Sequence, residues 1–390
     1  MSGQEGSGMS ASSSDPTGPA HQSGRVHHVG PAGSITDPGD AERADPSAEI
    51  LRVEDLTVRF PTDDGVVNAV RGVSYTLHPR EVLGIVGESG SGKSVSSMAV
   101  MGLLPRSARV SGRIVFRGDD VLTMRPEQQR GLRGRKIGMI FQDPMTAMNP
   151  VLTIGNQLAE AVRSHEHISQ SSALVRATEM LDLVGIPQAK TRLRSYPHEF
   201  SGGMRQRAMI AMAVINRPDV IFADEPTTAL DVTVQAQILD TLLDVKDAVD
   251  AAIVFITHDL GVIASVADRV LVMYAGKPVE TAGVDEIFTE PRMPYTAGLL
   301  GSMPTTDLIG ERLRPIQGTP PSLISLPSGC PFRPRCPIAV AQCATSEPPL
   351  TETDRRGHSA ACHRWQDVAG YEDATSMFRV DPAAVGGTTP

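Results

Sequence analysis

The stretch GESGSGKS, residues 87–94, has the glycine spacing and the closing Lys-Ser pair of a loop that binds phosphate groups. Glycines at these positions let backbone N–H groups approach a polyphosphate, and a helix that begins where the loop ends adds a favourable dipole. Lys93 can reach the β- and γ-phosphates of a nucleotide, and the Ser94 hydroxyl can ligate Mg²⁺. A plain glycine turn does not need the whole pattern, so we predict a nucleotide site. Its predicted residues are Gly87, Ser89, Gly90, Ser91, Gly92, Lys93, Ser94 and Val95.

A second segment, DVIFADEP (219–226), places two carboxylates at the end of an apolar, β-branched run. A phosphate-loop site needs an acidic side chain at the end of a neighbouring strand to hold Mg²⁺, and Asp224 fits this role. Glu225 follows directly, where a carboxylate can act as general base on an attacking water. By themselves, two acids at a strand end are an ordinary solvated feature. Together with the phosphate loop they predict Mg²⁺-dependent hydrolysis.

Polar residues also end two other short apolar runs. Gln142 follows GMIF, and His258 follows IVFIT. An amide at such a position could contact Mg²⁺ or the attacking water, although a single Gln or His there is more often structural. A third feature, FSGGMRQR (200–207), has a hydroxyl and two glycines before a helical run, and so looks like a second phosphate loop. Taken alone, it reads as a capped helix start.

These residues lie on a chain that alternates strand and helix patterns from residue 50 onwards. ILRVEDLTVRF alternates apolar and polar residues, and EVLGIVG, KIGMIF, DVIFAD, AAIVFIT and DRVLVMY are short β-branched runs. Helical patterns separate most of them, which predicts an α/β domain with a mainly parallel sheet. Between Pro150 and Glu199 the strands stop, and IGNQLAEAV and SALVRATEMLDLVGI read as amphipathic helices of an insert.

The composition bounds the other parts of the chain. Residues 1–48 are rich in Ser, Gly, Pro and Asp, which predicts a disordered tail. We expect a nucleotide-binding domain at 49–306 with its helical insert at about 150–200, a Cys-rich extension at 307–366 and a loose tail at 367–390. The net charge of -9 speaks against a nucleic-acid surface. We find neither a signal peptide nor the run of about 18 apolar residues that spans a bilayer, and so expect a cytosolic chain.

Six motifs occur in one order: GESGSGKS, FQDP, FSGGMRQR, IFADEP, TALD and ITHD. In this order they resemble the ATP-binding subunits of ABC transporters over about residues 50–305. The resemblance implies a RecA-like core with an antiparallel β subdomain and a helical subdomain, and it implies ATP and Mg²⁺ as ligands. It also implies that Gln142 senses Mg²⁺ and touches membrane subunits, that His258 contacts the γ-phosphate, and that Phe60 lies against adenine.

The same resemblance gives FSGGMRQR a role in a second chain. In this family two such domains pack head to tail. Ser201, Gly202 and Gly203 would then close over the γ-phosphate held by the partner's phosphate loop, and Asp231 would lie across the same interface. One chain holds one phosphate loop and one such segment, so a second ATP-binding chain is required.

Further stretches narrow the resemblance to one subfamily. FSGGMRQR has Phe200 and Met204 where the wider family favours Leu and Gln; with FQDPMTAMNP and PRMPYTAGLL it resembles ATPases of dipeptide and oligopeptide importers. This implies a related but different ATP-binding partner, two membrane permeases, an extracytoplasmic peptide-binding protein, and a place on the cytoplasmic face of the plasma membrane. An importer of nickel or glutathione remains an alternative. A soluble ABC ATPase would be expected to carry a long coiled coil or two cassettes.

All four cysteines lie late in the chain, at Cys330, Cys336, Cys343 and Cys362. The intervals of five, six and eighteen residues between them differ from the close Cys pairs of common zinc folds. The segment resembles the C-terminal extension of peptide-importer ATPases, which implies a [4Fe–4S] cluster on these four thiols. Zinc, free thiols and disulfides remain alternatives.

Overall fold

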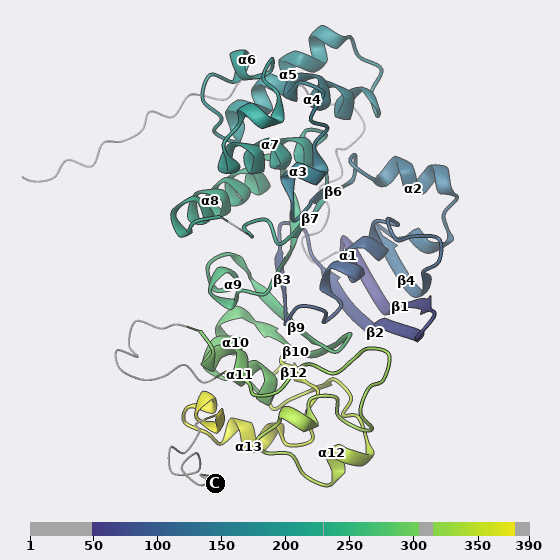
Figure 1. Ribbon diagram of the computed structural model, residues 1–390, viewed down its shortest axis with the longest axis vertical. Helices are drawn as coiled ribbons and strands as arrows, with labels where there is room; N and C mark the ends of the chain where they lie inside the picture. Colours follow the sequence, from purple (N-terminus) through teal and green to yellow (C-terminus); the bar gives the residue numbers. More distant parts are fainter. Residues whose placement is uncertain (1–48, 229, 304–314, 379–390) are drawn as a thin grey trace, which may run out of the picture. The chain divides into compact units, whose positions relative to one another are not determined.

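The computed structural model describes residues 49–228, 230–303 and 315–378 (Figure 1). The predicted tail at 1–48 and the predicted boundary at 306–307 lie outside these residues, as does the last part of the predicted tail at 367–390. The predicted domain limits therefore stay predictions. No helix in the described ranges combines the length and the apolar character needed to cross a membrane.

Several of the described strands begin and end close to the predicted runs. They are β1 (Leu51–Thr62), β2 (Gly65–Leu77), β3 (Val82–Val86), β4 (Arg109–Phe116), β5 (Asp119–Asp120), β6 (Ile137–Ile140), β7 (Val220–Asp224), β8 (Ala252–Thr257), β9 (Arg269–Tyr274), β10 (Lys277–Gly283), β11 (Thr351–Glu352) and β12 (Ser359–Ala360). Sequence patterns had not indicated β4, β5, β10, β11 or β12.

The same residues also form α-helices between and after the strands. They are α1 (Lys93–Val100), α2 (Pro126–Leu132), α3 (Pro144–Ala147), α4 (Ile154–Arg163), α5 (Gln170–Leu183), α6 (Ala189–Arg192), α7 (Gly202–Val214), α8 (Val232–Val249), α9 (Leu260–Val266), α10 (Val284–Thr289), α11 (Pro294–Gly301), α12 (Gln342–Thr345) and α13 (Trp365–Ala369). Short 3₁₀ turns are η1 (Val121–Thr123), η2 (Pro197–Glu199), η3 (Arg333–Arg335) and η4 (Ala374–Phe378).

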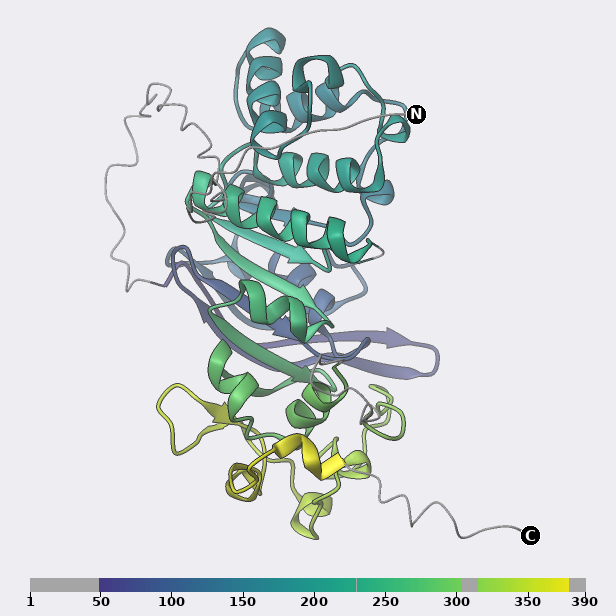
Figure 2. The same cartoon turned by 90° about the vertical axis from the view of Figure 1, so that its left-hand side faces the viewer.

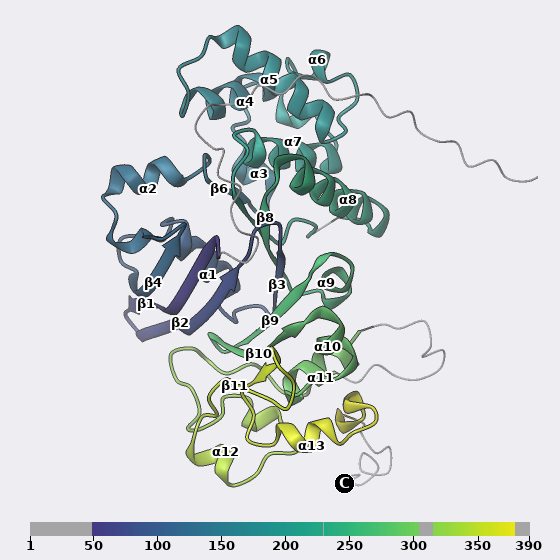
Figure 3. The same cartoon turned by 180° about the vertical axis from the view of Figure 1, so that it is seen from behind.

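The main sheet has the strand order β11-β12-β10-β9-β3-β8-β7-β6. Its neighbours from β9 to β6 run parallel, whereas β10, β12 and β11 add on in antiparallel pairs. The two small strands of the C-terminal extension therefore continue the sheet beyond β10 (Figure 3). A second, antiparallel sheet has the order β2-β1-β4-β5. The predicted α/β fold with an antiparallel β subdomain is confirmed.

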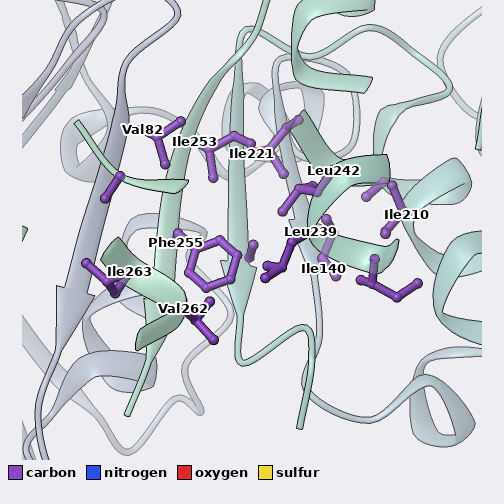
Figure 4. Close-up of a cluster of buried hydrophobic side chains, with 14 of the residues drawn as sticks. Val82, Ile140, Ile210, Ile221, Leu239, Leu242, Ile253, Phe255, Val262 and Ile263 are labelled. Carbon is purple, nitrogen blue, oxygen red and sulfur yellow. The ribbon is translucent and has the colours of Figure 1, made fainter. Parts of the chain in front are cut away.

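The central strands of the main sheet are buried on both faces: successive residues point to opposite sides, and each side lies in an apolar cluster. On β7, Ile221 and Ala223 belong to one apolar cluster, and Val220 and Phe222 belong to the other. The first cluster includes residues of α7, α8 and α9. Figure 2 shows the ribbons of α8 and α9 in front of the strands. Figure 4 labels its members Val82, Ile140, Ile210, Ile221, Leu239, Leu242, Ile253, Phe255, Val262 and Ile263. The second cluster includes residues of α1 and of the antiparallel sheet.

The helical insert is amphipathic, as predicted from its pattern. In α4 the apolar residues Leu158 and Val162 are fully buried, and the helix begins at Thr153, whose hydroxyl accepts a hydrogen bond from the Asn156 N–H at 3.3 Å. In α5, Ala173 and Ala177 lie in the same apolar cluster as the core residues under α7.

Candidate functional site

The strand order brings the predicted site residues to one edge of the main sheet. The strands β3, β8, β7 and β6 are parallel neighbours, so their carboxyl ends lie side by side. Open parallel sheets bind ligands at this edge. The phosphate loop follows β3, His258 follows β8, Asp224 ends β7 and Gln142 lies just after β6. Residues distant along the chain therefore meet because each follows a strand of one parallel set.

Glycine is required at two positions of the phosphate loop. Gly92 has φ +98°, and a Cβ on it would lie 2.3 Å from the Ala69 carbonyl oxygen of β2. Gly87 has φ +153°, and a Cβ there would lie 2.2 Å from the Met273 carbonyl oxygen. Gly90 has φ +79°, and an added Cβ would meet open space. The loop is thus held tightly at both ends and is open at its middle, as a cradle for phosphate must be.

Lys93 points back along its own loop. Its Nζ donates hydrogen bonds to the carbonyl oxygens of Gly87 at 2.7 Å and of Glu88 at 3.0 Å. Burial lowers the pKa of the Lys93 ammonium, while nearby carboxylates, chiefly that of Glu225, act in the opposite direction. A buried cation held by two carbonyls at the foot of the loop suits a phosphate site. The buried Ser91 hydroxyl has no hydrogen-bond partner among the described residues, which also fits a loop that binds a ligand.

Two of the three predicted magnesium ligands, Ser94 and Asp224, are in contact, whereas Gln142 contacts Glu225. The Ser94 hydroxyl donates to Asp224 Oδ1 at 2.8 Å. Burial raises the pKa of the Asp224 carboxyl, and the hydrogen bond from Ser94 opposes that shift. Hydroxyl and carboxylate oxygens are the ligands that Mg²⁺ prefers, so this pair fits the ion.

Glu225 is the centre of a polar network. Its carboxylate accepts hydrogen bonds from Gln142 Nε2 at 3.1 Å and from the Thr228 hydroxyl at 2.9 Å, and it lies 3.2 Å from His258 Nδ1. Its backbone has φ +46°, which is uncommon for a residue other than glycine, and its N–H donates to the Ile256 carbonyl. Such strain is often found at functional sites. The fold therefore aims this carboxylate at the residues predicted to surround the attacking water.

A cavity of about 660 Å³ joins most of these groups, although Ser91 and Asp224 are not among the residues that line it. Its lining includes most of the phosphate loop, Gln142, Glu225 and His258. It also includes Glu88, Thr228 and Leu299, which sequence reasoning had not selected. Thr228 could have been found from its place three residues after Glu225. Glu88 occupies a variable position of the phosphate-loop pattern, and Leu299 is a single apolar residue of α11, so neither had a local signal.

Other predicted residues lie elsewhere. Ser201 caps the start of α7, where its hydroxyl accepts a hydrogen bond from the Met204 N–H at 3.4 Å. Asp231 caps the start of α8, where its carboxylate accepts one from the Val234 N–H at 2.9 Å. Ser201, Gly202 and Asp231 are exposed, and neither they nor Gly203 line the cavity. Phe60 is half-buried on β1, opposite Val67 of β2, and it does not line the cavity either.

Comparison with known proteins assigns the family. Residues 70–228 match the family model described as ABC transporter, and residues 279–343 match the model described as oligopeptide/dipeptide transporter, C-terminal region. The dipeptide transport ATP-binding protein DppD of Bacillus subtilis is 55% identical over 297 residues, which are 76% of this chain and 89% of that protein. This chain belongs to the ABC transporter family. The family prediction made from the six motifs is confirmed.

Further relatives of this ABC chain bear similar names. The oligopeptide transport ATP-binding protein OppD of Salmonella typhimurium is 49% identical over 82% of this chain and 95% of its own length. OppD of Mycobacterium bovis is 52% identical over 86% of this chain, and the matched part spans 56% of that longer protein.

Solved structures support the same fold. The ATP-binding cassette MJ0796, in a dimeric structure bound to ADP and Pi, aligns with a TM-score of 0.54 and 24% identity over 60% of this chain and 98% of its own. The protein cbiO1 of Clostridium perfringens, part of the ABC transporter complex cbiONQ, aligns with a TM-score of 0.53 and 27% identity over 62% of this chain and 91% of its own. The alignments confirm an ABC-type fold.

The cysteines of this ABC chain lie in the extension, and all four are free thiols. The Cys330 N–H donates to the Cys343 carbonyl at 2.8 Å. Burial raises the pKa of Cys336 to about 11 and that of Cys362 to about 12, and the charges of the other cysteines act in the same direction. Among the described residues, no group of three or more His, Cys, Asp or Glu side chains could hold a metal ion. The structure therefore gives no support to the predicted [4Fe–4S] cluster.

Proposed function

We propose that this chain is the ATP-hydrolysing subunit of an ABC importer that takes up dipeptides or oligopeptides. The observation that carries the proposal is the network around Glu225, which joins Gln142, His258 and Thr228 in the cavity that also holds Lys93. The peptide substrate is supported by the names of the relatives and by the match of residues 279–343. The same ATPase role in an importer of nickel or glutathione is the alternative.

Each residue has a distinct part in this proposal. The phosphate-loop amides and Lys93 bind the β- and γ-phosphates and neutralise their charge. Ser94, Asp224 and Gln142 would hold Mg²⁺, which supplies further neutralisation of the phosphate oxygens. Glu225 accepts a proton from the attacking water, and its contacts with Gln142, Thr228 and His258 fix the direction in which it points.

The proposal requires a second ATP-binding chain. Ser201 and Gly202 are exposed at the start of the 13-residue α7, and Asp231 is exposed at the start of the 18-residue α8. Because these residues do not line the cavity of their own chain, we infer that they close over ATP held by a related partner. Two permeases, an extracytoplasmic peptide-binding protein and a site on the cytoplasmic face of the plasma membrane complete the proposed complex.

Substitution of Glu225 tests the catalytic role. Glu225→Gln should reduce ATP hydrolysis about 10² to 10⁴-fold, because a positioned general base contributes about that much, while ATP binding persists. Glu160→Gln, at an exposed position of α4, is the matched control and should hydrolyse ATP normally. Unchanged turnover in Glu225→Gln would remove the assigned base.

The transport role is tested separately by recovering the tagged chain from membranes of its own host. A peptide importer predicts that a second ATP-binding chain and two permeases accompany it, and that deletion of the chain abolishes uptake of a labelled dipeptide. Normal peptide uptake in the deletion strain would exclude this substrate class.

We also propose a [4Fe–4S] cluster on Cys330, Cys336, Cys343 and Cys362. Its support is the resemblance of the extension and the presence of four free thiols within it. Anaerobically purified chain should be brown and contain about four iron atoms per chain, and Cys336→Ser should lose this iron. A colourless chain with stoichiometric zinc would replace this proposal by a zinc site.

A further inference from the structure

Arg335 links the C-terminal extension to the phosphate loop. Its guanidinium donates two parallel hydrogen bonds to the Glu88 carboxylate, at 2.6 and 2.8 Å, and its side chain is only 4% exposed. It also donates to the Gln317 carbonyl oxygen at 3.1 Å. Burial would lower the pKa of Arg335, but the hydrogen bond to Glu88 raises it, so the side chain stays charged. A buried two-point contact of this kind is among the strong polar contacts in proteins.

Glu88 is held at each of its polar groups. Its carboxylate binds Arg335, its backbone N–H donates to the Tyr295 hydroxyl at 2.8 Å, and its carbonyl oxygen accepts a hydrogen bond from Lys93 Nζ at 3.0 Å. Glu88 also lines the cavity beside Lys93. One residue therefore joins the extension, α11 and the phosphate-binding lysine.

The turn that carries Arg335 is firmly docked on the core. Arg335 ends η3, which lies between Cys330 and Cys336. Phe332, at the start of this turn, packs edge-on against Tyr274 at a centroid distance of 5.3 Å and against Tyr295 at 5.4 Å. The guanidinium carbon of Arg335 lies 5.9 Å from the Tyr274 ring centroid. These contacts limit the positions that Arg335 can take, so its placement depends on the fold of the extension.

The charge of Glu88 makes this link important for the nucleotide. An ionised carboxylate at the wall of a phosphate site repels a triphosphate, unless a cation neutralises it. We propose that Arg335 is a positioning residue of the nucleotide site: it neutralises Glu88 and holds the start of the phosphate loop, so that the Cys-rich extension contributes to ATP binding. This proposal rests on the proposed ATPase function. It means that the extension supports the binding of ATP to its own chain.

Binding of Mg-ATP to the full-length chain, measured by calorimetry, tests the proposal. Arg335→Ala should raise the Kd about tenfold, because it leaves an uncompensated carboxylate beside the phosphates. Adding Glu88→Gln to Arg335→Ala removes that carboxylate and should restore the Kd to within about threefold of the starting value. A purely structural role for Arg335 would predict no such recovery, since the double variant lacks the same contacts.

Two further variants complete the test. Arg333→Ala removes the same residue type from the same turn. Arg333 has no side-chain hydrogen bond or ion pair with the described residues, so the Kd of this variant for Mg-ATP should equal that of the unchanged chain. Arg335→Lys keeps the charge but not the two-point contact, perturbs folding less, and should lose less affinity than Arg335→Ala.

Three outcomes would overturn the proposal. An unchanged Kd in both Arg335→Ala and Arg335→Lys would show that the contact does not serve the nucleotide. Equal losses of ATP affinity in Arg335→Ala and in the double variant would show that the Glu88 charge does not cause the loss. A wild-type chain that binds no ATP would instead overturn the proposed function, and this inference with it.

Discussion

The buried pair of Glu280 and His358 offers a quantitative test of how the extension is held. Glu280 of β10 and His358 are 0% and 1% exposed, and Glu280 Oε1 lies 2.8 Å from His358 Nε2. The carboxylate also accepts hydrogen bonds from the backbone N–H groups of Arg292 and Met293. One side chain thus joins β10, the segment that leads into α11, and the turn before β12. We expect Glu280→Ala to loosen all three.

The magnitude follows from the groups left without a partner. The substitution strands two buried backbone N–H groups and a buried imidazole; each buried polar group left without a partner costs about 1 to 3 kcal/mol, so we expect a total loss of at least about 3 kcal/mol. The single tryptophan, Trp365 in α13, reports unfolding of the extension through its fluorescence. With a urea dependence of about 2 kcal/mol/M, a loss of about 3 kcal/mol lowers the midpoint by about 1.5 M.

A matched glutamate in the same region serves as the control. Glu352 of β11 is exposed, and its carboxylate accepts one hydrogen bond, from the Gly357 N–H at 2.9 Å. Glu352→Ala should change the free energy of unfolding by less than about 1 kcal/mol. If Glu280→Ala lowered the urea midpoint no more than Glu352→Ala does, the buried carboxylate would not anchor the extension.

Two further predictions concern the phosphate loop. Gly92→Ala should lower the melting temperature of the nucleotide-free chain clearly more than Gly90→Ala. Both positions have a positive φ that strains a side chain, but an added Cβ at Gly92 would also lie 2.3 Å from a backbone oxygen, whereas one at Gly90 meets open space. Equal shifts would contradict the close approach of Gly92 to β2. Ser94→Ala should reduce the Mg²⁺-dependent gain in ATP affinity about tenfold or more, measured as the ratio of Kd values with Mg²⁺ and with EDTA. Ser97→Ala is its control, because the Ser97 hydroxyl donates to the Ser94 carbonyl oxygen at 2.9 Å. A full Mg²⁺ effect in Ser94→Ala would show that the Ser94 hydroxyl is not a ligand.

The local elements of this chain could be predicted from the sequence, because each depends on a short stretch of residues. The phosphate loop is contiguous from β3 to α1, and a strand, a glycine turn and a helix start follow from neighbouring residues. The apolar runs of β7 and β8 and the helical period of α4 were likewise predicted, since burial imposes a period on each element. The sequence alone therefore determined the parallel core, the family and most residues that line the cavity.

The tertiary structure decided which distant groups touch. Arg335 and Glu88 are 247 positions apart, and His358 and Glu280 are 78 apart. Their contacts depend on how the extension docks on β10 and α11, and no periodicity within a segment encodes that docking. The antiparallel order of β10, β12 and β11 and the tight approach of Gly92 to β2 likewise depend on packing between separate segments of the chain. A short segment specifies its own backbone shape, whereas a hydrogen bond between remote side chains exists only after the whole sheet has been assembled.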